Sequence, residues 1–189
     1  MPLVRKETKL AGLYIIEPLQ FRDSRGYFWE VFNTDKWKSE LGLDINVVQF
    51  NQSGSVRDVV RGLHFQFDPP MGKLMRVTKG AGFLVAVDIR VNSPTLGQWV
   101  GVEVSEENKL QVWADAGFAR GFCALSDYLE LQYLCTGTYN GKGESSFKWN
   151  DPEVGVKWPV EKPIVSDRDD SAQSFREWLA RPEAQRFKI

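Results

Sequence analysis

The chain contains a single histidine, His64, in the segment VVRGLHFQFDPPMGKLMR. Arg61 lies three residues before it and Lys73 nine residues after it, so charged groups interrupt otherwise apolar segments. A neutral imidazole accepts a proton near neutral pH, which makes His64 a candidate general base. The competing interpretation is a partly buried histidine that only satisfies its hydrogen bonds within the protein, which is the usual outcome for a lone histidine.

Tyr133 is the matching candidate for a general acid. In the segment LELQYLC, apolar residues alternate along what reads as a strand. This alternation places Tyr133 on the same face as Leu129 and Leu131, so its phenol is expected to point into the interior. An imidazole and a phenol that face one interior space form a plausible base and acid pair.

A metal site is not expected. Protein sites for iron, manganese or zinc usually combine several imidazoles with a carboxylate, and one histidine per subunit does not supply them. An all-oxygen Mg²⁺ or Ca²⁺ site remains open, although no EF-hand-like spacing supports it. The sequence also contains no GxGxxG or Walker loop, so it gives no sign of a nicotinamide site.

Short strands are expected to position these residues. The segments FLVAVDIR (83–90), QWVGVEV (98–104) and LELQYLC (129–135) alternate with period 2, which is typical of half-buried strands. Turn signals separate such segments, and Asn140-Gly141 in particular favours a tight hairpin. Many short strands with few helices predict an all-β fold, and a jelly-roll barrel with short peripheral helices is the natural candidate.

Two segments read as helices. TDKWKSEL, from Thr34, carries Trp37 and Leu41 four residues apart. A second helix is expected at about 171–181, where Asp170 or Ser171 is the predicted cap and Pro182 the predicted end.

The bulk properties exclude several function classes. The 189 residues fit one domain, spanning 1–189, and the net charge of −1 gives no basic excess for nucleic-acid binding. Residues 1–10 lack the apolar core of a secretory signal, and no apolar run is long enough to span a membrane. The two cysteines, Cys123 and Cys135, read as buried thiols in a reducing compartment. We therefore expect a cytoplasmic protein without nucleic-acid or membrane partners.

Beyond these patterns, the chain resembles the dTDP-4-dehydrorhamnose 3,5-epimerase family from about Gly12 to Asp169. Each matching segment is weak alone, but their order and spacing are specific. The segments are FRDSRGYFWEVFN (21–33), VVQFNQS (47–53), VRGLHFQ (60–66), GKLMRV (72–77), VAVDIRVNSPTLGQW (85–99), GFARGF (117–122), QYLCTGTYN (132–140), WNDPEVGVKWP (149–159) and SDRD (166–169).

The resemblance implies a cupin-like jelly roll and a homodimer with exchanged N-terminal strands. The implied substrate is dTDP-4-dehydro-6-deoxy-D-glucose, which is epimerised at C3 and C5 without a cofactor or metal. His64 falls at the position of the base, Asp169 at that of its carboxylate partner, Tyr133 at that of the acid, and Lys73 opposite the 4-keto oxygen. Tyr139 falls where an aromatic ring stacks on thymine. Further ligand-contact positions are Arg25, Glu30, Gln49, Asn51, Arg61, Glu144 and Arg168.

Three positions depart from the commoner family pattern. Arg120 stands where histidine is most frequent, Leu84 where aspartate is usual, and Phe50 where an acidic residue is usual. Arg120 keeps a donor and a permanent charge for substrate binding, but it cannot act as a base. Two alternatives therefore stay open: an epimerase that inverts one centre or acts on a modified 4-keto sugar, and a non-catalytic cupin that binds a sugar nucleotide.

Overall fold

Two antiparallel sheets carry the architecture of the computed structural model, which describes residues 3–189. The six-stranded sheet has the order β1-β2-β10-β7-β12-β5. Its strands are β1 (Val4–Glu7), β2 (Leu13–Glu17), β10 (Gln111–Ala114), β7 (Lys73–Lys79), β12 (Tyr128–Cys135) and β5 (Gln49–Val56). The five-stranded sheet has the order β13-β6-β11-β8-β9. Its strands are β13 (Glu144–Ser146), β6 (Val60–Gln66), β11 (Phe118–Ala124), β8 (Ala81–Asp88) and β9 (Trp99–Ser105).

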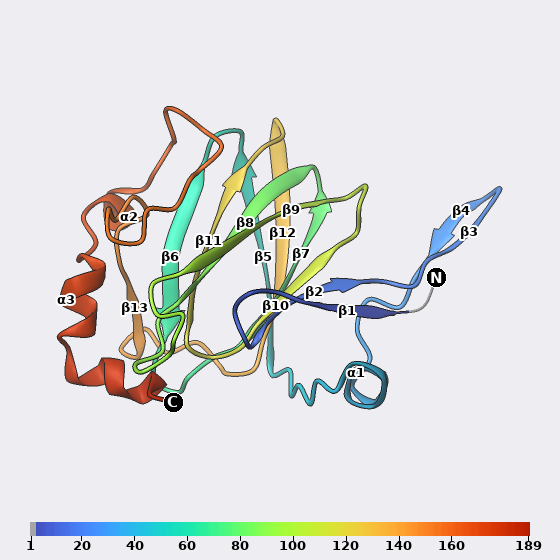
Figure 1. The fold of residues 1–189 in the computed structure, drawn as a ribbon. Coiled ribbons are helices and arrows are strands. Elements are labelled where there is room, and N and C mark those ends of the chain that lie inside the picture. Colours follow the sequence, from blue (N-terminus) through green and yellow to red (C-terminus); the bar gives the residue numbers. More distant parts are fainter. Residues whose placement is uncertain (1–2) are drawn as a thin grey trace.

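The two sheets pack face to face and form the predicted jelly roll (Figure 1). Alternate residues of both sheets point into a shared core, as the pleat of a strand requires. This inner core holds Met75, Leu84, Phe122, Leu129 and Leu131, with Tyr133 packed against it. The prediction that Tyr133 shares an inward face with Leu129 and Leu131 is thus confirmed.

The strand β8 differs from the expected half-buried pattern, because it is buried on both faces. Its Leu84 and Ala86 belong to the inner core, whereas Val85 and Val87 belong to a second core on the outer side of the five-stranded sheet. Helix α3 (Phe175–Leu179) and the 3-10 helix η1 (Pro182–Phe187) contribute to this second core and cover that face. A strand that is covered on both sides no longer needs polar residues on one of them.

The predicted helix at 171–181 is wrong in its bounds. Helix α3 begins at Phe175, because Ser174 and Glu177 form a capping box there. The segment before it contains the single turn α2 (Asp167–Asp170), which Ser166 caps. Pro182 does not stop the chain from turning: it lies at the first position of η1, where its missing N–H costs nothing.

The predicted N-terminal helix is present as α1 (Thr34–Leu41), with Asn33 as its cap. Trp37 and Leu41 are buried in a third core on the outer face of the six-stranded sheet. Among the described residues, no helix is long and apolar enough to cross a membrane.

The hairpin of β3 (Phe21–Asp23) and β4 (Gly26–Phe28) pairs with neither large sheet and extends away from the barrel (Figure 1). It nevertheless carries large apolar side chains, since Phe21 is 57% and Phe28 67% exposed. An exposed aromatic hairpin of this kind is typical of a surface that another chain covers.

Candidate active site

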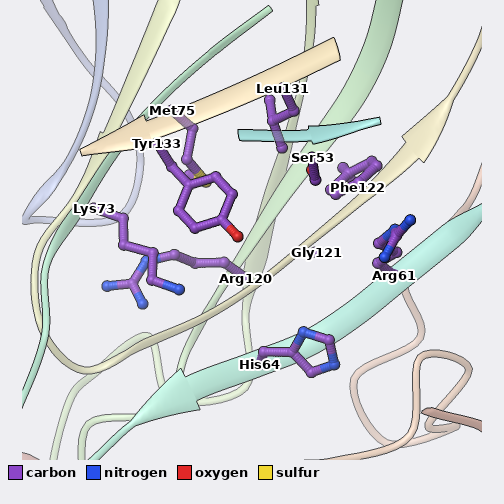
Figure 2. Close-up of a pocket in the computed structure, with 10 residues that line it drawn as sticks. All are labelled: Ser53, Arg61, His64, Lys73, Met75, Arg120, Gly121, Phe122, Leu131 and Tyr133. Carbon is purple, nitrogen blue, oxygen red and sulfur yellow. The ribbon is translucent and has the colours of Figure 1, made fainter. Parts of the chain in front are cut away.

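A cavity of about 230 Å³ opens between the two sheets. Its lining comes from strands of both sheets, so that polar groups from distant parts of the chain meet in one space (Figure 2). The lining residues are Ser53, Arg61, His64, Lys73, Met75, Arg120, Gly121, Phe122, Leu131 and Tyr133.

His64 lies on β6, and its ring is held by a buried carboxylate. The Nε2 atom lies 2.6 Å from Oδ1 of Asp169, a residue that is only 3% exposed. An ionised carboxylate only accepts hydrogen bonds, so Nε2 carries the hydrogen in the neutral ring. Nδ1 is then the unprotonated nitrogen, and Figure 2 shows one ring nitrogen turned toward the cavity. This arrangement fixes the tautomer of the ring, as the action of a general base would require.

Asp169 is itself anchored by the backbone. Its Oδ2 accepts the N–H of Gly62 at 3.2 Å, and the loop before α2 is tied to β6 by the hydrogen bond from Val60 N–H to the carbonyl of Ile164. Gly62 has a φ of +136°, and a Cβ there would lie 2.7 Å from the Cα of Gly121. Only glycine therefore allows β6 and β11 to approach this closely while the N–H faces the carboxylate.

The charge state of Asp169 follows from these contacts. Burial raises the pKa of its carboxyl, but the hydrogen bonds from His64 and Gly62 outweigh burial, and the net pKa lies below the ordinary value. The carboxylate is thus ionised at neutral pH and available to orient the imidazole.

Asp169→Asn is expected to lower the free energy of unfolding at pH 7 by about 1–3 kcal/mol, because buried hydrogen-bonding groups lose their partner. The folded pKa of Asp169 lies below the unfolded value of 3.8, so this stabilisation is present above that pH and fades as the pH falls through the folded pKa. Urea unfolding at pH 7 and at progressively lower pH measures it. An equal difference between the two proteins at every pH would contradict this assignment.

Tyr133 enters the same cavity from β12, in the opposite sheet (Figure 2). Burial raises the pKa of its phenol, and the charge of Arg61 offsets only part of that rise. The phenol therefore stays protonated at neutral pH and is able to donate a proton. The imidazole and the phenol thus come from facing sheets across one space.

Two cations complete the lining. Lys73 on β7 places Nζ 5.1 Å from the centroid of the Tyr133 ring. Burial, reinforced by the charge of Arg120, lowers the pKa of Lys73. Arg120 on β11 is 5% exposed, and burial lowers its pKa to about 10, so it remains charged at neutral pH.

A second, smaller cavity of about 120 Å³ adjoins the first, since Lys73 and Tyr133 line both. It brings together the predicted contact residues Gln49, Asn51, Tyr139 and Glu144. Gln49 accepts the backbone N–H of Tyr139 at 2.7 Å and donates to Asn51 at 3.1 Å.

Arg168 joins the rim of this second cavity through an ion pair with Glu144 at 2.6 Å. The hydroxyl of Tyr139 donates to the same carboxylate oxygen at 3.3 Å, while its ring stays largely exposed. An exposed aromatic ring with fixed polar neighbours is suited to stacking on a planar ligand.

Two predicted contact residues lie elsewhere. Arg25 is on the protruding β3–β4 hairpin, where it pairs with Asp23 at 2.6 Å. Glu30 follows that hairpin and pairs with Lys36 at 2.9 Å. Within one chain neither residue lines the two cavities, because the hairpin extends away from the barrel (Figure 1).

Other lining residues were not predicted. Ser53 was detectable, because it continues the alternation of Gln49 and Asn51 along β5. The hydrogen bond from the Gly62 backbone to Asp169 could not be predicted, because a backbone N–H leaves no pattern of side chains in the sequence. Among residues 3–189, no three His, Cys, Asp or Glu side chains group together as a metal site would require.

Comparison with known proteins gives consistent matches along the chain. The model of the family described as dTDP-4-dehydrorhamnose 3,5-epimerase matches residues 7–177. The dTDP-4-dehydrorhamnose 3,5-epimerase of Methanothermobacter thermautotrophicus is 47% identical over 174 residues, which cover 90% of this chain and 94% of that protein. The dTDP-4-dehydrorhamnose 3-epimerase of Streptomyces niveus is 39% identical, over 86% of this chain and 79% of its own length.

Among solved structures, the dTDP-6-deoxy-D-glucose-3,5-epimerase of Legionella pneumophila superimposes with a TM-score of 0.91 at 40% identity. The match covers 97% of each chain, and that enzyme was crystallised in complex with dTDP-4-keto-L-rhamnose. The similarity therefore extends over the sequence, the barrel and the strands that line both cavities.

Proposed function

This chain belongs to the dTDP-4-dehydrorhamnose 3,5-epimerase family and is thus an isomerase; from that premise we propose that it inverts C3 and C5 of dTDP-4-dehydro-6-deoxy-D-glucose. The observation that carries the proposal is the placement of the carboxylate-held imidazole of His64 and the phenol of Tyr133 on facing sheets of one cavity.

The chemistry begins with the 4-keto group, which acidifies the C–H bonds on the two neighbouring carbons. Nδ1 of His64 takes the proton, the C–H electron pair forms a C=C bond, and the carbonyl pair moves to O4 as an enolate. The phenol of Tyr133 then delivers its proton to the carbon from the opposite face, which inverts the centre. Exchange with water removes the added proton from His64 and restores that of Tyr133 before the second centre reacts.

The remaining polar residues bind the substrate and stabilise the enolate. Lys73 supplies positive charge where O4 becomes negative, a preorganised electrostatic contribution. Arg61 is suited to the diphosphate, since its planar guanidinium matches phosphate oxygens; in the free protein it donates to Ser55 and to the Gly54 carbonyl. The smaller cavity, with Tyr139 at its rim, would hold the thymidine.

The proposed enzyme is a homodimer in which the β3–β4 hairpin of each subunit completes the site of its partner. This proposal is supported by the exposed aromatic residues of the hairpin and by the distance of Arg25 and Glu30 from the cavities of their own chain. We place the enzyme in the cytoplasm, without nucleic-acid or membrane partners, in agreement with its net charge of −1.

Mixed dimers test this arrangement. We expect the Arg25→Ala and the His64→Ala homodimers each to be weakly active, because both active sites of such a dimer carry the substitution. When the two variants are unfolded and refolded together, half of the dimers are mixed and each mixed dimer has one intact site. About a quarter of the wild-type activity is therefore expected to return.

The control pairs His64→Ala with Tyr133→Phe, whose substitutions both lie in the cavity of their own chain, so that no inversion activity should return. Light scattering measures the assembly directly. A monomer, or an Arg25→Ala variant with full activity, would contradict the exchanged hairpin.

Proton NMR in D₂O tests the proposed reaction itself. We expect deuterium at both C3 and C5 when the purified protein is mixed with dTDP-4-dehydro-6-deoxy-D-glucose. A coupled 4-ketoreductase and NADPH should then yield dTDP-rhamnose. The absence of any exchange would instead point to a protein that binds the sugar nucleotide without acting on it.

A single-centre epimerase is the second candidate, because the Streptomyces niveus relative is named a 3-epimerase. In addition, Arg120, which stands where the family most often has histidine, lines the larger cavity. Which centres this chain inverts therefore has to be measured on this chain itself. Deuterium at C3 alone in the same NMR experiment would select this candidate.

A further inference from the structure

The carboxylate that holds His64 lies in a loop that belongs to neither large sheet. Asp169 is part of the single turn α2, between two points where the backbone is bound to other parts of the chain. Before the turn, the carbonyl of Ile164 accepts the N–H of Val60 at 3.0 Å. After the turn, the carbonyl of Gln173 accepts the N–H of Lys148 at 2.9 Å. The position of the carboxylate therefore depends on how firmly these two ends are held.

The second end is held by a side chain as well as by the backbone. Gln173 is half-buried, and its Nε2 atom donates to the hydroxyl of Ser145 and to the carbonyl of Ser146, both at 2.9 Å. Both hydrogens of the amide are thus used in hydrogen bonds of normal length. The two acceptors belong to β13, the strand at the edge of the five-stranded sheet. Gln173 therefore fixes the loop to that edge.

This edge lies directly beside the imidazole. Ser146 is opposite His64 in the antiparallel pairing of β13 with β6. Gln173 follows Asp169 by four residues, and the loop lies beside the edge formed by β13 and β6 (Figure 1). The amide of Gln173 thus joins the strand next to the base to the segment that carries the carboxylate. It acts across the same gap as the 2.6 Å hydrogen bond between Nε2 of His64 and Oδ1 of Asp169.

A second side-chain link between the loop and β13 is weaker. Arg168 pairs with Glu144 at 2.6 Å, but the side chain of Arg168 is 59% exposed. Exposed ion pairs stabilise little, because water screens the charges and the long side chains lose freedom. Glu144 also lines the smaller cavity, where a bound ligand can engage it instead. The uncharged amide of Gln173 is therefore the more permanent of the two links.

We propose that Gln173 is a positioning residue, which keeps Oδ1 of Asp169 within hydrogen-bond distance of His64 by holding the loop against β13. It thereby maintains the tautomer that a general base needs. Gln173 lines neither cavity, so it acts through Asp169 and not on the substrate. The effect on the rate rests on the proposed epimerase function, whereas the effect on the imidazole does not.

Gln173→Met tests the inference, because it keeps the length of the side chain and removes the donor. His64 is the only histidine, so proton–nitrogen NMR spectra of the untagged protein contain the ring signals of one imidazole and report its tautomer. We expect the hydrogen on Nε2 in the wild type and a mixture of both tautomers in the variant. The kcat for deuterium wash-in should fall by about 10–10²-fold, as for a small misplacement of a catalytic group, with KM nearly unchanged.

Ser145→Ala is the matched variant, because it removes one of the two acceptors and leaves the amide in place. Its effects on the tautomer and on kcat should be smaller than those of Gln173→Met. The double variant should be no worse than Gln173→Met alone, since the shared hydrogen bond can be lost only once. If Gln173→Met does not fold, Ser145→Ala carries the test, and an unchanged tautomer in it would overturn the inference.

Asn108→Leu controls for a loss of stability alone. Its Nδ2 atom also donates to a backbone carbonyl, that of Glu103 at 3.0 Å, but next to β9 at the opposite edge of the sheet. It should leave the tautomer and kcat unchanged. An unchanged tautomer and kcat in Gln173→Met, additive losses in the double variant, or an equal change in Asn108→Leu would overturn the inference. A wild-type protein that holds the hydrogen on Nε2 but exchanges no deuterium would instead overturn the proposed function.

Discussion

Replacing His64 with alanine is expected to slow deuterium wash-in at the sugar carbons by about 10²–10⁴-fold, the usual effect of removing a general base. The imidazole lines the larger cavity, and a buried carboxylate holds it in one tautomer, because Nε2 donates to Asp169 at 2.6 Å. Proton NMR in D₂O measures the loss as the rate at which the C3 and C5 proton signals disappear.

The loss should be specific to proton transfer. Binding of dTDP is expected to be unchanged in His64→Ala, because the smaller cavity does not include His64. Added imidazole should restore part of the wash-in rate, since it can occupy the space that the side chain leaves. An unchanged wash-in rate in His64→Ala would remove His64 from the mechanism.

Replacing Tyr133 with phenylalanine is expected to separate exchange from inversion. His64 can still remove a proton and return a deuteron to the same face, so wash-in should continue. Inversion needs a donor on the other face, and its rate should fall by about 10²–10⁴-fold. The ratio of deuterated substrate to inverted product, followed by NMR over time, measures this separation.

Tyr128→Phe is the matched control, because Tyr128 lies on the same strand but is exposed at the surface and lines neither cavity. It should leave both rates close to those of the wild type. If Tyr133→Phe slowed exchange and inversion equally, the phenol would not act as a face-specific proton donor.

Sequence patterns predicted where the strands lie better than they predicted which faces of the strands are buried. Period-2 alternation located β8, β9 and β12, and it placed Tyr133 inward. It could not show that β8 is covered on both faces, because the covering helices follow some ninety residues later in the chain.

Local signals misled where the partner strand was not a neighbour in sequence. The Asn140-Gly141 pair does lie in a turn, closed by the hydrogen bond from Gly143 N–H to the carbonyl of Asn140. The strands on its two sides, β12 and β13, nevertheless belong to different sheets, so the expected tight hairpin is wrong. Turn chemistry sets the local backbone, whereas the sheet that each strand joins depends on long-range pairing.

The candidate site was predicted in part from the residues themselves. The lone His64, the alternation around Tyr133 and the charges of Arg61 and Lys73 all pointed to one interior, and these four residues line one cavity. Asp169 needed the family resemblance, because it is 105 residues from His64 and no local pattern joins them.

Other features of the site follow from backbone placement. The N–H that anchors Asp169 belongs to Gly62, whose value lies in having no side chain. Arg25 and Glu30 were placed at ligand contacts by resemblance alone, and a single chain keeps them outside both cavities. Their proposed role depends on a second subunit, which residue patterns within one chain do not encode.

In the proposed mechanism, an imidazole and a phenol reach opposite faces of one ketosugar ring. A crystal structure of the Tyr133→Phe variant with the 4-keto sugar nucleotide bound would test it most directly. We predict that Nδ1 of His64 lies about 3–3.5 Å from a carbon next to the keto group, with residue 133 against the other face of the ring. Finding both side chains on one face, or the ring outside the cavity that they share, would contradict the account.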